Sequence, residues 1–427
     1  MKIILSKQDL KIKSTYYFKT GLIFLLMTAV YFNVAKIFQY YGFELETSIP
    51  KACVGIILIF LSSILVLYKF NYDLKNSFIV YVHQFMFIPI IVLFSFGGIG
   101  IELLICHVIF LLSLKISMSL KLKKLKTTIF SNTYPIEKKQ NRVVIYVLAM
   151  ILLLPFISSF NNFSWSSFIQ SELYAIRFSA RQTESFLMGY FKAPLVRVLL
   201  PILFVYATTK RKYILMAIVG LIITLIYGST GAVKSIIVVI PIILFFVSSK
   251  TYLQIQQRLF LIIFMFLSLS IFETAVIGSY FITDIPNRRL FFVPGFLENN
   301  YITEFKDNYL FYKTSYLDFL FSEKNVRVTQ IIGGKYLGDY SINANVGVLM
   351  DGFINLGYIG VFIHASVVGL AIRALNNMKI NPAFFGLFFV YFYYVNTSFL
   401  GTLLITHGLL FLIIASKFFL KDQYQEI

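Results

Sequence analysis

The chain has few of the residues on which most enzyme sites and secreted domains depend. Its 427 residues include two cysteines, one tryptophan and four histidines, and only 13% are charged. Cys53 and Cys106 fall in apolar runs, so neither a disulfide framework nor a metal site is expected. The sequence also lacks a phosphate-binding glycine loop, an Asp-x-Asp pair and a Gly-x-Ser-x-Gly turn. These absences argue against nucleotide-driven chemistry, and we expect no metal and no cofactor.

What the chain has in abundance is apolar sequence. It is 58% hydrophobic and 18% aromatic. Runs of about 17–25 apolar residues recur along its length, which indicates an all-α polytopic membrane protein. We predict one transmembrane domain over residues 1–427 with about twelve spans. These are 17–38, 52–70, 78–97, 100–118, 143–160, 194–208, 213–228, 234–249, 258–280, 346–372, 382–398 and 400–416.

The net charge of +19 predicts an orientation in the membrane. Lysines crowd the N-terminal tail, the 115–142 loop, the 210–212 turn and the C-terminal tail. With twelve spans these segments share one side, which the positive-inside rule makes cytoplasmic. We therefore expect a multi-pass protein of the cytoplasmic (inner) membrane with both termini in the cytoplasm. Because the basic residues are explained by topology, we expect no nucleic-acid partner.

Two segments outside the membrane are long under this topology, a medium loop over 161–193 and a large loop over 281–345. Arginine is concentrated on that side. Its planar fork donates parallel hydrogen bonds to phosphate, which suits an anionic ligand. The alternative is that these arginines pair with the carboxylates of the same loops. The six outer arginines are Arg177, Arg181, Arg197, Arg288, Arg289 and Arg327.

Aromatic residues in the large loop recur at helical spacing. The stripe consists of Phe305, Tyr309, Tyr312, Tyr316 and Phe319, separated by four, three, four and three positions. This periodicity predicts one helix. Such a helix would lie in the membrane interface, or it would form a wall on which sugars or a lipid tail stack.

The start of the 346–372 span carries Asp351 and Asn355, four positions apart among several glycines. A carboxylate in a span must face the bundle interior or a wet cavity. Asp351 and Asn355 are therefore candidates for a functional site, and the alternative is a polar contact between helices. All four histidines lie in or near spans, where a lone histidine is more often a packing residue than a base.

With these residues in view, the chain resembles the Wzy-type oligosaccharide repeat unit polymerases of O-antigen and capsule synthesis. The resemblance covers the span pattern, the two outer loops and the stretch from Ser341-Ile-Asn-Ala-Asn345 to Gly357-Tyr-Ile-Gly360. The loops of that family carry an arginine and a glycine with ten residues between them, a spacing that Arg327 and Gly338 match. Arg177 and Gly189 are one residue too far apart.

The resemblance implies a GT-C-like membrane glycosyltransferase that needs no cofactor. Its substrates would be repeat units carried on undecaprenyl diphosphate, and its partners membrane lipids and a chain-length regulator protein. Fixed cations would stabilise the diphosphate leaving group. We expect Arg288, Arg289 and Arg327 in that role, then Arg177 and Arg181, with Asn345, Asn355 and Gly338 also at the substrate. A base would take the proton of the attacking hydroxyl, and its candidates are Asp351, Asp339, Glu298 and His407.

Two rival functions stay open. An O-antigen ligase would use the same donor, and composition does not distinguish it from a polymerase. A flippase or other transporter of lipid-linked oligosaccharide belongs to a different class. Transporters show internal repeats and broken helices near the middle of the bilayer, and the sequence shows neither plainly.

Overall fold

The computed structural model describes residues 7–120, 138–157, 160, 163–168, 191–229, 234–313 and 327–421. Across these residues every regular element is helical, and no strand occurs. Six of the described helices, 19–29 residues long, are long and apolar enough to cross a membrane. The chain therefore has the character of a polytopic membrane protein. The six are Lys13–Ile37, Ile49–Leu67, Leu74–Phe96, Ile101–Ser119, Tyr252–Ile277 and Val348–Asn376.

The chain forms two compact units, each built from segments that are distant in sequence. Unit 1 contains Met1–Ser119, Gln256–Leu370 and Val395–Leu400. Unit 2 contains Leu120–Ile255, Ala371–Tyr394 and Gly401–Ile427.

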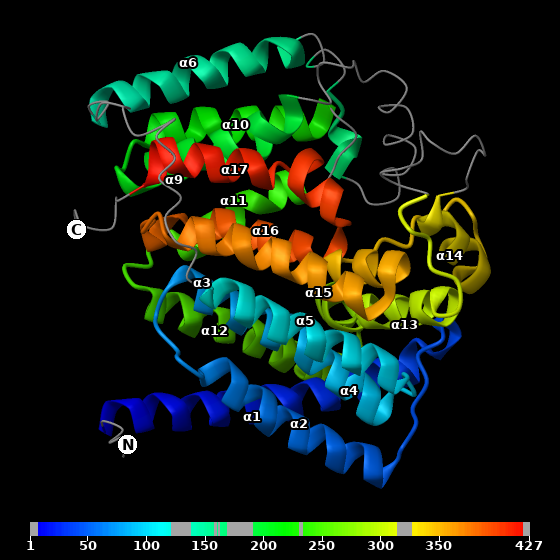
Figure 1. The fold of residues 1–427 in the computed structure, drawn as a ribbon. Coiled ribbons are helices and arrows are strands. Elements are labelled where there is room, and N and C mark those ends of the chain that lie inside the picture. Colours follow the sequence, from blue (N-terminus) through cyan, green and yellow to red (C-terminus); the bar gives the residue numbers. More distant parts are fainter. Residues whose placement is uncertain are drawn as a thin grey trace. The chain divides into compact units, whose positions relative to one another are not determined.

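In unit 1 the first helices lie side by side with helices from the middle of the chain (Figure 1). The large predicted loop, 281–345, carries regular structure of its own, including two helices. The elements are α1 (Lys7–Ile37), α2 (Ile49–Leu67), α3 (Leu74–Tyr81), α4 (Ile88–Phe96), α5 (Ile101–Ser119), most of α12 (Tyr252–Phe272), α13 (Val293–Phe305), α14 (Val328–Leu337) and most of α15 (Val348–Asn376).

One apolar helix forms the centre of unit 1. It runs through α3, a π-helical segment at Val82–Phe87 and α4, and its most apolar stretch is buried completely. A helix that is apolar all round has no face for water, so it belongs in the middle of the bundle. His83 lies within it, with Nδ1 bonded to the Tyr16 hydroxyl at 2.9 Å and Nε2 to the Ser62 hydroxyl at 2.8 Å. His83 is thus a packing histidine, as expected for a histidine in a span.

The helix predicted for the aromatic stripe is wrong over the part that the structure describes. Helix α13 ends at Phe305, and residues 306–313 form turns instead of a helix. Phe311 and Tyr312 take left-handed backbone angles, with φ of 49° and 62°, which no α-helix tolerates. Tyr316 and Phe319 lie outside the described residues.

Unit 2 is a separate group of shorter apolar helices with an aromatic core. Phe246 packs against Phe385 and Phe389, with ring centroids 4.9 and 5.5 Å apart. The Tyr252 hydroxyl donates to the Ile380 carbonyl at 3.0 Å. The described helices are α6 (Lys138–Ile157), α9 (Leu200–Thr209) with a π-helical segment at Ala193–Leu199 before it, α10 (Tyr213–Ser229), α11 (Lys234–Phe246), most of α16 (Phe385–Thr397) and α17 (Leu409–Ala415).

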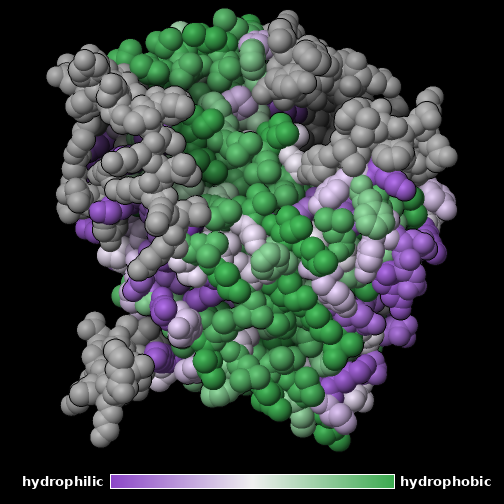
Figure 2. Space-filling model, viewed as in Figure 1, coloured by the Kyte–Doolittle hydropathy of each residue, from purple (hydrophilic) through white to green (hydrophobic). Residues whose placement is uncertain are grey.

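The surface of unit 1 matches a membrane environment. Figure 2 shows hydrophobic residues over the middle of its helices and hydrophilic residues toward the helix ends. Helix α2 is a clear example, because Ile57, Phe60 and Leu61 are all more than half exposed. Lipid provides the apolar surroundings that such a face requires.

Candidate functional site

The span predicted over 346–372 is a helix in two limbs. The backbone leaves helical geometry at Leu356 (φ −140°, ψ 19°) and at Gly357 (φ 61°, ψ −145°). A positive φ of this kind favours glycine, since a side chain would clash with the neighbouring carbonyl. The first limb therefore ends at Asn355, and the second begins at Tyr358.

Beyond the break the chain turns back on itself. A Cβ built on Gly352 would lie 2.5 Å from the carbonyl oxygen of Gly360, so the two backbones touch. In a straight helix residues eight positions apart lie about 12 Å apart along the axis. The first limb is itself only about 12 Å long, too short to cross a bilayer, whereas the second limb of about 28 Å is long enough.

The loop after α13 closes the open end of the first limb. The Leu310 N–H donates to the Ile354 carbonyl at 2.8 Å, and the Phe311 N–H donates to the Asn355 carbonyl at 3.2 Å. The Tyr312 N–H donates to Asn355 Oδ1 at 2.7 Å. Helix-end carbonyls are costly to bury without partners, so these bonds allow the limb to end inside the protein.

Asp351, on the first limb, is 1% exposed. Its Oδ2 accepts the backbone N–H of Leu400 at 2.8 Å, and its Oδ1 accepts the Asn355 side-chain amide at 3.2 Å. Asn355 also donates to the Asp351 carbonyl at 2.7 Å. The sequence prediction that Asp351 faces the protein interior is confirmed, and Asn355 lies directly beside it.

His364 comes from the second limb and completes the cluster. Its Nδ1 lies 3.6 Å from Asp351 Oδ2 and 3.3 Å from the Val348 carbonyl, and its Nε2 lies 2.8 Å from the Tyr312 hydroxyl. Both groups facing Nδ1 are acceptors, so we assign the ring proton to Nδ1. Nε2 then carries the lone pair, and the Tyr312 hydroxyl donates to it.

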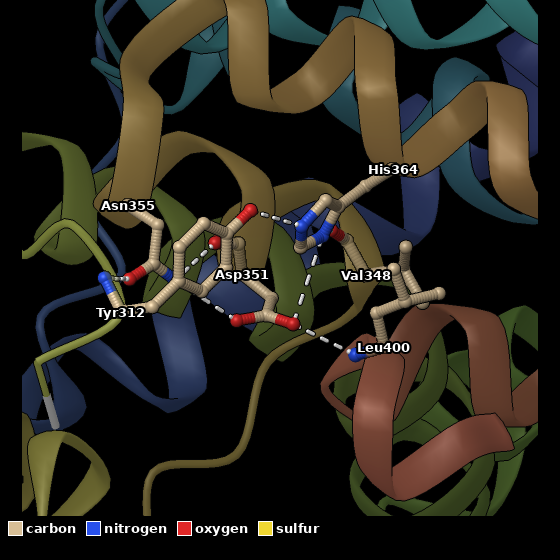
Figure 3. Close-up of polar contacts among 6 residues, drawn as sticks. All are labelled: Tyr312, Val348, Asp351, Asn355, His364 and Leu400. Atoms are coloured by element: carbon tan, nitrogen blue, oxygen red, sulfur yellow. Dashed lines mark hydrogen bonds and ion pairs between the residues drawn. The ribbon is translucent and has the colours of Figure 1, made fainter. Parts of the chain in front are cut away.

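Figure 3 shows these side chains converging between the two limbs, with the Leu400 backbone at one side. A carboxylate beside Nδ1 holds an imidazole in one tautomer and stabilises the imidazolium that forms when Nε2 takes a proton. Burial, with a smaller contribution from the Asp351 carboxylate, raises the pKa of Tyr312. Tyr312 therefore keeps its proton and remains a donor. The arrangement can accept a proton from a hydroxyl placed at Nε2.

Glu298 forms a second buried pair in unit 1. Its Oε2 lies 2.7 Å from His107 Nε2, and the two side chains are 1% and 2% exposed. Its Oε1 has no hydrogen-bond partner among the residues that the structure describes. Glu298 is thus held by His107 and does not belong to the Asp351–His364 cluster.

Asp339, another candidate base, lies in an exposed turn after α14. Its carboxylate accepts the Ser341 N–H and the Ser341 hydroxyl, both at 2.7 Å. These two bonds lower the pKa of Asp339, which makes it a weaker proton acceptor at neutral pH.

His407 belongs to unit 2. Its ring stacks on Tyr394, with centroids 4.0 Å apart, and the guanidinium of Arg197 lies over the same tyrosine ring at 5.3 Å. Arg197 also donates to the Thr406 carbonyl at 3.1 Å. These contacts place His407 in a packed stack of rings.

The predicted arginines differ in how far they are engaged. Arg288 is buried, forms an ion pair with Asp284 and lies over the rings of Phe38 and Tyr41 at 4.6 and 4.9 Å. Arg289 is 50% exposed and lies 3.8 Å from Asp284. Arg288 is therefore committed within the protein, whereas Arg289 is accessible to a ligand. Arg177 and Arg181 lie outside the described residues.

The spacing of Arg327 and Gly338 corresponds to one helix. Arg327 is the exposed residue before α14, and Gly338 follows it with a left-handed φ of 76°. The ten intervening residues are α14 itself, and Gly338 is a helix terminator of the usual kind. Asn345 is exposed in the extended segment before α15, next to Ala344, whose carbonyl accepts the Tyr301 hydroxyl at 2.8 Å.

Two residues of the cluster were missed as site residues. His364 follows Asp351 by thirteen positions, which in a straight helix would place the two about 20 Å apart and on different faces. Tyr312 was assigned to an aromatic stripe. The signal that could have found His364 was Gly357, because a break there returns the second limb to Asp351.

No protein-family model matches the chain, and neither a curated protein nor a solved structure is significantly similar to it. The cluster and the residues that carry the sequence resemblance are therefore the features that bear on function.

Proposed function

We propose that the chain is a membrane glycosyltransferase that polymerises oligosaccharide units carried on undecaprenyl diphosphate at the outer face of the cytoplasmic membrane. The observation that carries the proposal is the Asp351–His364 pair, buried on the two limbs of a broken helix with a hydroxyl at His364 Nε2. Glycosyl transfer from a lipid diphosphate requires a base for the attacking hydroxyl and no nucleotide. The segment that carries the sequence resemblance, residues 341–360, also contains part of the cluster, namely Asp351 and Asn355, and the helix break at Gly357.

The roles of the residues follow from their exposure and partners. His364 takes the proton, Asp351 orients His364, and Asn355 holds Asp351 and Tyr312 together. Arg289 and Arg327 are exposed cations suited to the diphosphate, whose charge grows as the glycosidic bond breaks. Arg288 supports the surrounding fold through Asp284, so we no longer assign it to the leaving group.

The proposal includes the twelve-span topology with both termini in the cytoplasm and a GT-C-like fold. It takes as eleven of these spans the six long helices and five shorter apolar ones, Val143–Ile157, Ala193–Thr209, Tyr213–Ser229, Ile236–Phe246 and Leu409–Leu420. It takes α16 as the twelfth.

A second function is favoured by one observation. A discontinuous membrane helix with a buried carboxylate and histidine is also typical of proton-coupled transporters. The break at Leu356–Gly357 is such a discontinuity, which the sequence did not show plainly. A transporter that moves the lipid-linked unit across the membrane is therefore the alternative.

A sugar-polymer gel on a strain lacking this chain separates the two. Loss of the ladder with a single repeat unit still displayed on the surface supports polymerisation. Loss of the single unit as well supports transport, or the ligase activity that the sequence left open. An unchanged ladder contradicts all three.

A further inference from the structure

The Tyr312 hydroxyl lies at the place where a reacting hydroxyl would have to bind the proposed base. It lies 2.8 Å from His364 Nε2, and the two rings stack with centroids 6.0 Å apart and 24° between their planes. A neutral imidazole has one ring nitrogen that can accept a hydrogen bond, and here that nitrogen already accepts one from the Tyr312 hydroxyl. In this state no second hydroxyl can approach the same nitrogen.

The turn that carries Tyr312 is strained. Phe311 and Tyr312 are consecutive left-handed residues, although neither is glycine, asparagine or aspartate, the types that tolerate such angles. The Phe311 side chain is 54% exposed, so its packing does not explain the conformation. Strain of this kind persists only where surrounding contacts hold it, and it is typical of functional sites.

Three hydrogen bonds to the end of the first limb of α15 hold the turn. They are the bonds from the N–H groups of 310–312 to the Ile354 carbonyl, the Asn355 carbonyl and Asn355 Oδ1. The hydroxyl bond to His364 ties the Tyr312 side chain to the second limb. Tyr312 is partly exposed, whereas Asp351 and His364 are buried, so the tyrosine lies on the accessible side of the base.

We propose that Tyr312 is a gate at the acceptor subsite, whose hydroxyl marks the place of the attacking sugar hydroxyl and must leave before that hydroxyl can bind. The inference rests on the proposed function. The ligand class is a sugar hydroxyl of the incoming lipid-linked unit, which offers His364 the same O–H donor that the tyrosine now offers. The strained turn favours exchange, because leaving the closed position relieves the two left-handed residues.

The reaction balances without another reagent. The displaced tyrosine keeps its proton, and the sugar hydroxyl gives its proton to His364 Nε2. The sugar oxygen bonds to the anomeric carbon of the donor, and the bond from that carbon to the diphosphate oxygen breaks. The diphosphate leaves with the electron pair, and the proton on His364 is later released to it or to water.

Tyr312→Phe tests the gate, since it keeps the stacked ring and removes the competing hydroxyl. The assay uses the full-length chain in liposomes and the lipid-linked oligosaccharide extracted from a strain lacking it. Loss of one neutral hydrogen bond should lower the concentration of this oligosaccharide at half-maximal rate by about two- to tenfold. The maximal rate should stay close to that of the wild type.

Phe311→Asn tests the same gate with the opposite sign. Asparagine tolerates a left-handed backbone, so it stabilises the closed turn. The half-maximal concentration should rise by about two- to fivefold. Tyr309→Phe is the matched control, because Tyr309 lies three residues before Tyr312 in the same loop and packs edge-on against Phe353 rather than on His364.

The outcomes separate the gate from the proposed function. If the wild type extends nothing, the proposed function is wrong and the gate falls with it. If the wild type extends chains but neither variant shifts the half-maximal concentration, the gate alone is wrong. A loss of about a hundredfold in maximal rate for Tyr312→Phe would make the tyrosine a required proton relay, which also overturns the gate. Should Tyr312→Phe not fold, Phe311→Asn decides alone.

Discussion

Gly352 and Gly360 lie backbone against backbone, although eight positions separate them in the sequence. This contact holds the two limbs of α15 together and brings Asp351 to His364. It requires that neither residue carry a side chain, because a Cβ on either one would overlap the carbonyl of the other.

Gly360→Ala should therefore destabilise the protein by about 1–3 kcal/mol, as overpacking of a close contact does. The measurement is the thermal midpoint of the purified protein in detergent, together with the yield of monodisperse protein. Gly21→Ala is the control, because nothing lies within 4 Å of a Cβ at Gly21. Equal midpoints for the two variants would mean that the limbs do not pack as described.

Asp351→Asn and Asp339→Asn should separate the two aspartates. Asparagine at 351 can still accept the Leu400 N–H, but it gives the imidazolium of His364 no counter-charge, so the extension rate should fall by about a hundredfold or more. Asp339 is exposed, and among the described residues its carboxylate bonds within its own turn, so Asp339→Asn should stay within about twofold. The liposome extension assay measures both, and the reverse order would move the base to Asp339.

Arg288→Ala and Arg289→Ala should separate structure from ligand binding. Loss of Arg288 leaves Asp284 without its closest partner and removes the cation from the Phe38 and Tyr41 rings. We expect a loss of about 2 kcal/mol in stability. Arg289→Ala should change stability by about 0.5 kcal/mol or less and should weaken substrate binding instead. Thermal midpoints and half-maximal concentrations test both, and an unchanged midpoint for Arg288→Ala would return that arginine to the list of ligand-binding residues.

The Glu298–His107 pair should behave as one structural unit. Removal of either partner from a buried pair leaves the other uncompensated, at a cost of about 3–5 kcal/mol. Glu298→Ala and His107→Ala should each destabilise the protein, and the double variant should be little worse than either, which a double-mutant cycle measures. If Glu298→Gln stayed fully stable yet lost chain extension, Glu298 would belong to the reaction.

Much of the fold could be predicted from the sequence, because apolar runs report burial in lipid directly. The helical character and the interior position of Asp351 follow from that rule alone. The predicted helix beyond Phe305 was wrong because hydrogen bonds to Ile354 and Asn355 hold this segment as a turn, against the helical spacing of its aromatic residues. Periodicity records local preference and carries no information about that distant partner.

The proposed base was harder to predict than its supporting carboxylate. In a straight helix Asp351 and His364 would lie far apart. The break at the left-handed Gly357 is what brings them together. The sequence contains that glycine, but several others lie nearby, and nothing local shows which one interrupts the helix. The roles of Arg288 and Gly338 were likewise decided by contacts and backbone geometry, which residue type alone does not reveal.

The polymer ladder of a strain whose own copy of this chain carries His364→Gln tests the proposed base directly. Glutamine keeps a polar side chain near Asp351 but cannot accept and hold a proton as imidazole does. With protein levels matched to wild type by immunoblot, we predict that the ladder collapses to a single repeat unit. A full ladder at matched protein levels would contradict the assignment of His364 as the base, and with it the proposed mechanism of chain extension.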